Sequence, residues 1–432
     1  MSLHIRALAA AALLSFLAPA RVAAEYGFVD KLAAAGTLGI PLSEARAIES
    51  KLGQLFVVNV DGFGYSGPLA LAPGYIPMVE RLQVGGVIPH YASTDFERIR
   101  RTNRALSAMT REPLLICCDI VRLSGKAGKT ARFGDGYVGG FIGRFRRLSD
   151  ADYRSLASLN AFVFSALGIN LALGPTMDDS TSDPRTAARA RLLIAELRRF
   201  GLEPVLKHFP FLPRGANLHR ESPDTKVALR DVEKRAEIFR ALAGESDILM
   251  TTHLRDSLVD SKIVTFSPRW IDIMRRRTGF KGLLMTDGLL MLANYSDQAS
   301  LLGGDASTDS SGVLDGAAAW ALHAVLAGHD LLIVEGSAAT TYRVFEGLLE
   351  VACQKTETGR QLRERIQSSA EKIARFKKQN EKLLRREVDV PAAVIGQIVS
   401  LVPAGGTDSA SFRFDPAALK RVQENLHRAA LR

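Results

Sequence analysis

Short runs of apolar residues recur along the chain, and each is followed by polar residues and then by apolar positions at helical spacing. This alternation is typical of repeated strand–helix units. It predicts eight strands, at 54–60, 86–89, 114–118, 169–173, 204–207, 248–251, 283–286 and 331–334. It also predicts intervening helices, at 75–83, 95–109, 150–167, 187–200, 226–243, 268–278 and 316–327.

Eight parallel strands with intervening helices close into a (β/α)8 barrel, an α/β fold whose active site is built from the loops after the strands. A doubly wound open sheet is the alternative, and it usually carries a glycine-rich phosphate loop after an early strand. Residues 123–130 approach the phosphate-loop pattern, but Leu123 stands where its first glycine belongs. We therefore interpret this segment as a basic surface loop and favour the barrel.

The composition agrees with a large folded core, since 47% of the 432 residues are hydrophobic and 24% are charged. These values exclude a disordered chain. The three cysteines are Cys117, Cys118 and Cys353, and two adjacent cysteines in a strand point to opposite faces. Their spacing matches no metal site, and we expect buried free thiols.

The first 24 residues have the order of a cleavable secretory signal: Arg6, an apolar run over 7–20, and small residues at 22–24. The apolar run is shorter than the ~20 residues that a bilayer span needs. Cleavage would remove Arg6 and Arg21, which leaves a formal charge of +8 from the original +10. We therefore expect a soluble protein that is periplasmic or secreted, with no stable membrane span after cleavage.

The remaining positive charge is concentrated near the C-terminus. Residues 361–387 predict an amphipathic helix dense in Lys and Arg, 403–411 a linker, and 415–432 a second basic helix. Nucleic-acid sites usually interleave aromatic residues with such charges, and none occur in the 361–387 helix beyond Phe376. We interpret the charge as a solvated helix face and expect no nucleic-acid partner. The domain organisation expected is a signal peptide over 1–24, a barrel over 25–345 and a basic helical extension over 346–432.

Two stretches at predicted strand ends contain residues suited to chemistry. Lys207 and His208 end the fifth strand, and Asp287 follows the seventh. Taken alone, Asp287 could cap the following helix, and Lys207 with His208 could be a buried pair bonded to neighbouring carbonyls. Local spacing does not separate these structural roles from functional ones.

Seven ordered motifs favour the functional interpretation. They are Leu-Gly-Gln-Leu-Phe at 52–56, Val-Gly-Gly-Val-Ile at 84–88, Lys-His-Phe-Pro at 207–210, Met-Thr-Thr-His at 250–253, Thr-Gly-Phe-Lys-Gly at 278–282, Met-Thr-Asp-Gly-Leu at 285–289 and Ala-Gly-His-Asp-Leu-Leu at 327–332. Their order and spacing, over residues 50–335, resemble glycoside hydrolase family 3 and its single-domain β-N-acetylglucosaminidase branch. The resemblance implies a (β/α)8 barrel, in agreement with the strand pattern.

The resemblance also implies roles for individual residues. Asp287 matches the nucleophile, and a retaining glycosidase needs a carboxylate there because it forms a covalent glycosyl-enzyme. Lys207 and His208 match ligands of substrate hydroxyls. Asp119 and Arg132 match further substrate-binding residues, although the segment between them departs from the family pattern.

In this branch the acid/base catalyst is a histidine after strand five, held by an aspartate two residues earlier. His219 stands in the histidine position, whereas Asn217 replaces the aspartate. An amide still forms a hydrogen bond to the imidazole but supplies no charge. Phe211 also replaces the glycine that the pattern has after Lys-His-Phe-Pro.

Two functions follow from the resemblance. The first is retaining hydrolysis of β-linked N-acetylglucosamine-containing glycans, peptidoglycan fragments among them. The alternative is a catalytically impaired member that binds a glycan or a cell-envelope partner without hydrolysis. In either case the partner is a carbohydrate or an envelope component, no cofactor or metal is implied, and we expect a monomer.

Overall fold

The computed structural model describes residues 27–60, 75–89, 96–118, 120–124, 130–134, 149–177, 185–211, 224–227, 229–295, 301 and 316–386 of the chain. For 120–124 and 130–134 the description is limited to the backbone.

The core of the fold is an eight-stranded parallel sheet in the order β10-β1-β2-β3-β6-β7-β8-β9. A parallel bridge between Met285 and Leu331 joins its two outer strands, so the sheet closes on itself. The (β/α)8 barrel is thereby confirmed, together with all eight predicted strands. The strands are β1 (Phe56–Val58), β2 (Gly86–Val87), β3 (Leu115–Cys118), β6 (Leu171–Ala172), β7 (Glu203–Phe209), β8 (Ile248–Thr251), β9 (Leu283–Met285) and β10 (Leu332–Val334).

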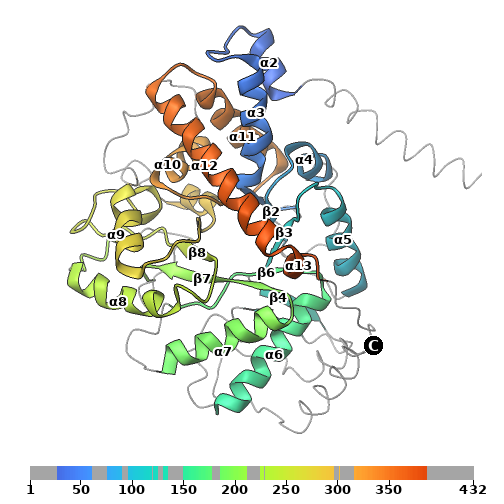
Figure 1. Ribbon diagram of the computed structural model, residues 1–432, viewed down its shortest axis with the longest axis vertical. Helices are drawn as coiled ribbons and strands as arrows, with labels where there is room; N and C mark the ends of the chain where they lie inside the picture. The colour runs from blue at the N-terminus through green and yellow to red at the C-terminus, as the bar shows by residue number, and fades with distance from the viewer. Residues whose placement is uncertain are drawn as a thin grey trace, which may run out of the picture.

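Helices surround the sheet, and the seven predicted from apolar spacing are all present with ends shifted by a few residues (Figure 1). These are α4 (Tyr75–Leu82), α5 (Phe96–Ala108), α6 (Asp150–Ala166), α7 (Arg185–Arg199), α8 (Leu229–Leu242), α9 (Pro268–Thr278) and α10 (Gly316–Ala327). The others are α2 (Phe28–Ala34), α3 (Leu42–Leu52), α11 (Ala338–Ala352), α12 (Glu357–Gln379), α13 (Glu381–Leu384) and the 3₁₀ turns η1 (Gly53–Leu55), η3 (Val264–Phe266) and η4 (Leu289–Asn294).

The sequence defines these elements locally. Helix α9 begins where the Ser267 hydroxyl accepts a hydrogen bond from the amide of Trp270, with Pro268 at its first position. It ends at Gly279, whose φ of 70° is left-handed and favours glycine. The strands are buried on both faces, as in β8 and β9, which explains why they read as continuous apolar runs.

Helix α12 crosses the amino ends of the strands, in front of the sheet in Figure 1. Its Lys377 is fully buried, and its ammonium donates to the Gln54 side chain at 2.9 Å and to the Gly85 carbonyl at 3.0 Å. The prediction of a solvated charged face holds for Arg375 and Lys378, which are exposed, but it is wrong for Lys377. Burial lowers the pKa of Lys377 to about 7.

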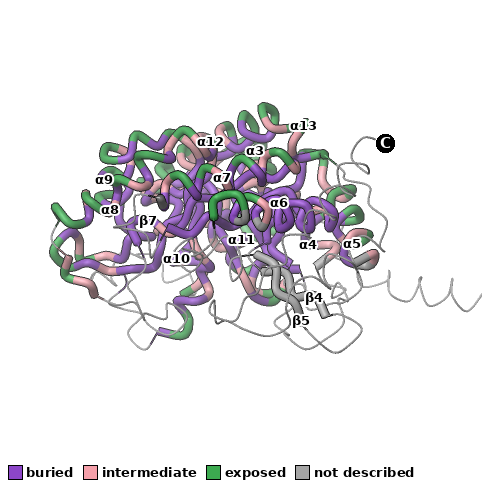
Figure 2. Tube along the Cα trace, turned by 90° about the horizontal axis from the view of Figure 1, so that it is seen from below, coloured by how far each residue is buried: buried purple, intermediate pink, exposed green. Residues whose placement is uncertain are grey.

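A hairpin that the sequence did not predict lies at the opposite side of the barrel from α12 and α13 (Figure 2). Strands β4 (Ile120–Ser124) and β5 (Thr130–Gly134) pair antiparallel, with Ser124 opposite Thr130. The expected loop over 123–130 is therefore wrong at both ends, because the β-branched and apolar residues on either side of the Gly- and Lys-containing segment favour strand pairing. Residues 125–129 lie outside the described part of the chain.

Two further observations concern the expectations from composition. Cys117, Cys118 and Cys353 are buried free thiols, as predicted. Within the described ranges, no helix combines the length and the apolar character that crossing a membrane requires. The basic helix predicted over 415–432 and the signal peptide predicted over 1–24 lie outside these ranges.

Candidate active site

The carboxyl end of β7 positions Lys207 and His208. The backbone of Lys207 is held on both sides, since its amide donates to the Pro175 carbonyl at 3.2 Å and its own carbonyl accepts from the Met177 amide at 2.6 Å. The ladder between β7 and β8 shifts register at this point. Such irregularities redirect side chains at the rims of barrels. Lys207 is buried, and the His208 side chain is 12% exposed.

Asp287 follows β9 at the same end of the barrel. One carboxylate oxygen, Oδ1, accepts a hydrogen bond from the Gly288 amide at 2.8 Å. The other, Oδ2, lies 3.8 Å from His208 Nε2, and the Asp287 side chain is 20% exposed. The structure thus brings His208 and Asp287 together from strands far apart in the sequence.

The surroundings of Asp287 favour its ionised form. Burial alone raises the pKa of this carboxyl. The electrostatic effects of His208, His253 and Lys207 oppose burial, and so does the hydrogen bond from Gly288. Together they outweigh burial, and the pKa of Asp287 lies below its ordinary value of 3.8. The carboxylate is therefore charged, partly exposed and available to an electrophile at neutral pH.

Both backbone groups of Gly288 are hydrogen-bonded: its amide donates to Asp287, and its carbonyl accepts from His253. His253 Nε2 lies 2.9 Å from the Gly288 carbonyl, and because a carbonyl only accepts, Nε2 carries the proton. His253 Nδ1 lies 2.8 Å from the Thr265 hydroxyl, which fixes the ring. His253 belongs to one of the seven motifs, yet the sequence analysis assigned it no role. Its position two residues after a strand was the available signal.

Glu335 is a second residue that sequence reasoning missed. It follows β10, and its carboxylate packs against Gly288 so closely that a Cβ there would lie 2.1 Å from Oε2. A larger residue at position 288 would therefore require the Glu335 carboxylate to shift. Asp287 was singled out because it directly follows a predicted strand. Glu335 holds the same position after the last predicted strand, so the same criterion points to it.

The other predicted site residues are not placed. Asn217, His219 and Asp119 lie outside the described residues, and for Arg132 the structure gives only the backbone, paired with Arg122 in the β4–β5 hairpin. Their roles stay predictions. Phe211 is buried, with the Arg235 guanidinium 4.1 Å from its ring centre.

The described residues contain no group of three or more His, Cys, Asp or Glu side chains placed to hold an ion. Lys207, His208 and Asp287 combine two proton donors with one carboxylate, a set suited to hydroxyl binding and nucleophilic attack.

The described residues thus form a parallel (β/α)8 barrel with a charged carboxylate at the carboxyl end of its seventh strand. The family model for the glycosyl hydrolase family 3 N terminal domain matches residues 47–376, which is most of the chain. The chain therefore belongs to glycosyl hydrolase family 3.

Two curated relatives carry the name beta-hexosaminidase. The protein of Stenotrophomonas maltophilia (strain K279a) is 26% identical over 226 residues, which is 46% of this chain and 65% of the relative. The protein of Alkalilimnicola ehrlichii is 29% identical over 245 residues, or 49% and 67%. The chain thus spans about two thirds of the length of these relatives.

Solved structures of the family share the fold. A family 3 β-N-acetylglucosaminidase from Paenibacillus sp. matches with a TM-score of 0.59 at 20% identity, covering 87% of this chain and 68% of its own. A β-N-acetylhexosaminidase from Beutenbergia cavernae matches with a TM-score of 0.54 at 20% identity, covering 77% and 98%. At these identities the likeness concerns the fold.

Proposed function

We propose that this protein is a retaining glycosidase that cleaves β-linked N-acetylglucosamine from glycans. The observation that carries the proposal is the Asp287 carboxylate, ionised and partly exposed beside His208 at the carboxyl end of the barrel. Active sites of such barrels lie at this end. The beta-hexosaminidase names of the relatives support the substrate class.

In the proposed first step, Asp287 Oδ2 attacks the anomeric carbon while the bond to the leaving oxygen breaks. His219 gives that oxygen a proton, so the leaving sugar departs as an alcohol and the first sugar stays as an ester of Asp287. In the second step, His219 takes a proton from water, whose oxygen displaces Asp287. Two inversions restore the β configuration, and the ionised state of Asp287 is regenerated.

The residues around Asp287 have positioning roles in this scheme. The His208 ring and the Lys207 ammonium are suited to donate to sugar hydroxyls, because both come from one strand beside the nucleophile. Asn217 is proposed to hold the His219 ring by a hydrogen bond. Because the Asn217 side chain carries no charge, it stabilises the imidazolium form of His219 less than an aspartate at that position would.

A peptidoglycan fragment in the periplasm is the proposed natural substrate. The support is the predicted signal peptide over 1–24, which would carry the protein to the compartment where such glycans occur. The chain acts as a monomer in this proposal, because each barrel holds its own nucleophile and its own hydroxyl ligands.

The test measures hydrolysis of an aryl N-acetyl-β-glucosaminide by residues 25–432, the chain that remains after the predicted signal peptide is removed. Release of the aryl alcohol by the wild type and its loss in Asp287→Asn support the proposal, and NMR of the first sugar formed must show the β anomer. Turnover that survives in Asp287→Asn, or an α product, contradicts it. Asp272→Asn, an exposed change on α9, is the matched control.

Glycan binding without hydrolysis is the second candidate, and Asn217 is the observation that favours it. Calorimetry with N-acetylglucosamine oligomers would then show binding while the sugars stay intact for days. Restoring the aspartate by Asn217→Asp distinguishes the two functions. A slow enzyme gains rate from this change, whereas a binding protein that has lost further groups stays inactive.

A further inference from the structure

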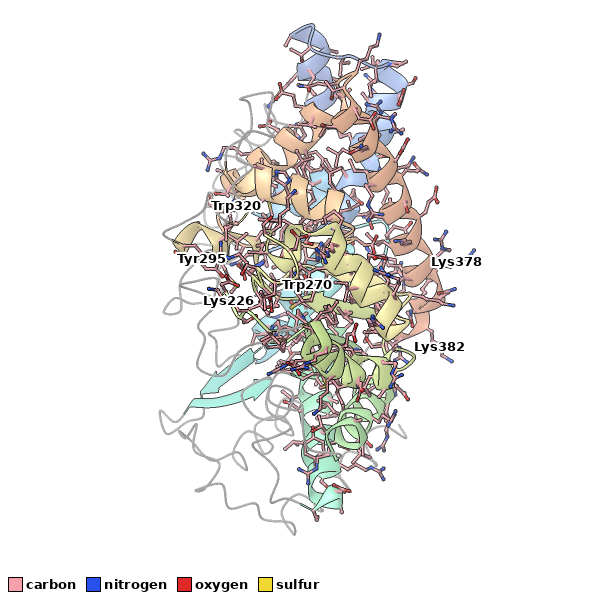
Figure 3. The ribbon with its side chains drawn as sticks, turned by 90° about the vertical axis from the view of Figure 1, so that its left-hand side faces the viewer. Lys226, Trp270, Tyr295, Trp320, Lys378 and Lys382 are labelled. Carbon is pink, nitrogen blue, oxygen red and sulfur yellow. The ribbon has the colours of Figure 1, made fainter. Side chains whose placement is uncertain are left out.

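His253 lies at the carboxyl end of the barrel, two residues after β8, and it is fully buried. Asp287 follows the neighbouring strand, β9, at the same end. In Figure 3 this end is marked by Tyr295, which follows the turn after Asp287 and lies on the side of the molecule opposite Lys378 and Lys382. The protonation state of His253 therefore bears directly on the candidate nucleophile.

Three hydrogen bonds determine where the protons of His253 lie. Nε2 is 2.9 Å from the Gly288 carbonyl, which only accepts, so Nε2 carries a proton. The Thr265 hydroxyl donates to the Thr252 carbonyl at 3.1 Å, and its oxygen also lies 2.8 Å from His253 Nδ1. Because a hydroxyl has a single hydrogen, Nδ1 is the donor in this last contact. Both ring nitrogens then carry protons.

A neutral His253 would break this set of bonds. The Thr265 hydroxyl would have to turn its hydrogen toward Nδ1, and the Thr252 carbonyl would lose that donor. Thr252 is fully buried, so water does not replace the lost bond. A buried carbonyl without a donor is destabilising, which favours the doubly protonated ring.

His329, a second fully buried histidine, shows the opposite arrangement. Its Nδ1 lies 3.1 Å from the Ala324 carbonyl and carries a proton. Its Nε2 lies 2.8 Å from the Thr251 hydroxyl, which has no second acceptor among the described residues and so gives its hydrogen to the ring. Burial, with a smaller effect from the nearby His253, lowers the pKa of His329 to about 4. This ring is neutral.

Charged groups from the neighbouring strands offset the charge of a buried imidazolium. Asp287 follows β9, and Glu335, after β10, packs its carboxylate against the residue next to Asp287. Lys207 and His208, from β7, act on the same Asp287 carboxylate as His253 does. A buried cation is tolerated where anions of this kind lie close to it.

The other ionisable groups around the ring have partners of their own or are few. On the loop that carries the ring, Arg255 acts on Asp224, and Asp256 accepts a hydrogen bond from the Thr225 hydroxyl. The turns η3 and η4 contain no ionisable side chain, and α10 contains only His323. Asp287 is thus the carboxylate on which a charge at position 253 acts.

We propose that His253 is a positioning residue held as an imidazolium, which fixes Gly288 and stabilises the ionised carboxylate of Asp287. Its Nε2 holds the Gly288 carbonyl, and the amide of Gly288 donates to Asp287 Oδ1 at 2.8 Å. Burial raises the pKa of Asp287, and the charge of His253 is among the effects that more than offset it.

The consequence for catalysis rests on the proposed function. In the second step of the proposed reaction, Asp287 leaves the glycosyl-enzyme as a carboxylate. A fixed positive charge beside it stabilises the negative charge that forms as the ester bond breaks. His253 contacts neither the substrate nor the reacting oxygen in this scheme, and it acts through Gly288 and through its charge.

The test is nitrogen NMR of residues 25–432 with isotopically labelled histidine at neutral pH, in which His253→Gln identifies the signals of His253 by their loss. Both ring nitrogens of His253 are expected to be protonated in the wild type. Thr265→Val removes the acceptor of Nδ1, so one nitrogen loses its proton, whereas Thr265→Ser keeps the hydroxyl and both protons. Thr251→Val, the matched change beside His329, leaves His253 doubly protonated.

The pH profile gives a second measurement. With a neutral His253, the acid limb of kcat/KM in Thr265→Val moves to higher pH by less than about one unit, and in Thr265→Ser it stays in place. A purely structural loss lowers the activity of Thr265→Val without moving the limb. Circular dichroism checks that each variant folds, and the conservative Thr265→Ser serves as the folded reference.

A wild-type His253 with one unprotonated ring nitrogen would overturn the inference, and so would a Thr265→Val variant that keeps both protons. These readings need no enzymatic activity, so they are distinct from a failure of the glycosidase proposal. A doubly protonated His253 in a chain that hydrolyses nothing would support the inference and contradict the proposed function.

Discussion

Two aspartates at opposite ends of neighbouring strands show how the barrel separates stability from chemistry. Asp330 precedes β10 at the amino end and is fully buried. It accepts from the Leu284 amide at 3.1 Å, the Ser369 hydroxyl at 2.8 Å and the Lys372 ammonium at 3.2 Å. Asp287 follows β9 at the carboxyl end and is 20% exposed, and its Oδ2 lies 3.8 Å from His208 Nε2.

The difference between the two lies in what their oxygens face. Both oxygens of Asp330 face donors from α9, α12 and the backbone, so its charge is neutralised and bound within the fold. Asp287 Oδ2 faces a polar, partly open site. A buried charge such as that of Asp330 is tolerated only when all its hydrogen-bonding and charged partners are present. A nucleophile such as Asp287 instead needs one carboxylate oxygen that a substrate can reach.

The largest expected effect is on catalysis. Asp287→Asn keeps the size of the side chain but removes the nucleophile, so kcat falls by about 10³-fold or more. Because the Asp287 carboxylate is partly exposed, the free energy of unfolding changes by less than about 1 kcal/mol. Steady-state assays and urea unfolding measure the two quantities. A large loss of stability would mean that Asp287 has the structural role assigned to Asp330.

The reverse outcome is expected for Asp330. Asp330→Ala leaves the cations from α9 and α12 without a buried partner, and the free energy of unfolding falls by about 3–5 kcal/mol. The exposed Asp272→Ala, which removes an i,i+4 pair with Arg276, costs no more than about 0.5 kcal/mol. Urea unfolding compares them. Equal stability of the two variants would contradict the role of Asp330.

A smaller effect on both properties is expected at Gly288. In Gly288→Ala the new methyl group meets the Glu335 carboxylate, so that Glu335 or Asp287 shifts. We expect kcat to fall by roughly 10-fold to 100-fold and stability by about 1–3 kcal/mol. Gly244→Ala is the matched control, since nothing lies within 4 Å of its Cβ. Equal activities in the two variants would contradict the contact.

The smallest expected effect is on the pH dependence. The pKa of Asp287 is depressed, so its carboxylate stays ionised until the pH falls below 3.8, and the acid limb of kcat/KM lies below that value. His208→Gln removes the imidazole whose electrostatic effect lowers the pKa of Asp287. The pKa of Asp287 then rises and the acid limb moves to higher pH, by less than about one unit. An unmoved limb would show that His208 does not act on Asp287.

The parts of the molecule that follow from local pattern were predictable. Apolar runs gave the strands, and the ends of strands gave Lys207, His208 and Asp287. The Gly288–Glu335 contact was not predicted, because it joins the ends of two strands and depends on side-chain packing. Asp330 and its partners were missed for a similar reason: Ser369 and Lys372 lie about forty residues further along the chain.

Lys377 shows the same limit of local pattern. It lies in α12 among exposed lysines and arginines, and its charge does not distinguish it from them, although its spacing from Ala370 and Ile373 places it on the buried stripe of the helix. Its burial depends on Gln54 and Gly85, which come from the first part of the barrel. The charge pattern therefore predicted correctly that α12 is an amphipathic helix, but it predicted wrongly that Lys377 is exposed to solvent.

The Lys377 contact has a consequence for the order of folding. Its partner Gln54 is 323 positions earlier in the chain, so the first strand of the barrel is synthesised long before the side chain that closes its amino end. A nascent chain that stops short of Lys377 leaves the Gly85 carbonyl without this donor. The last strand of the barrel, β10, ends at Val334, so all eight strands are synthesised before Lys377, and this contact at the amino ends of β1 and β2 is added after them.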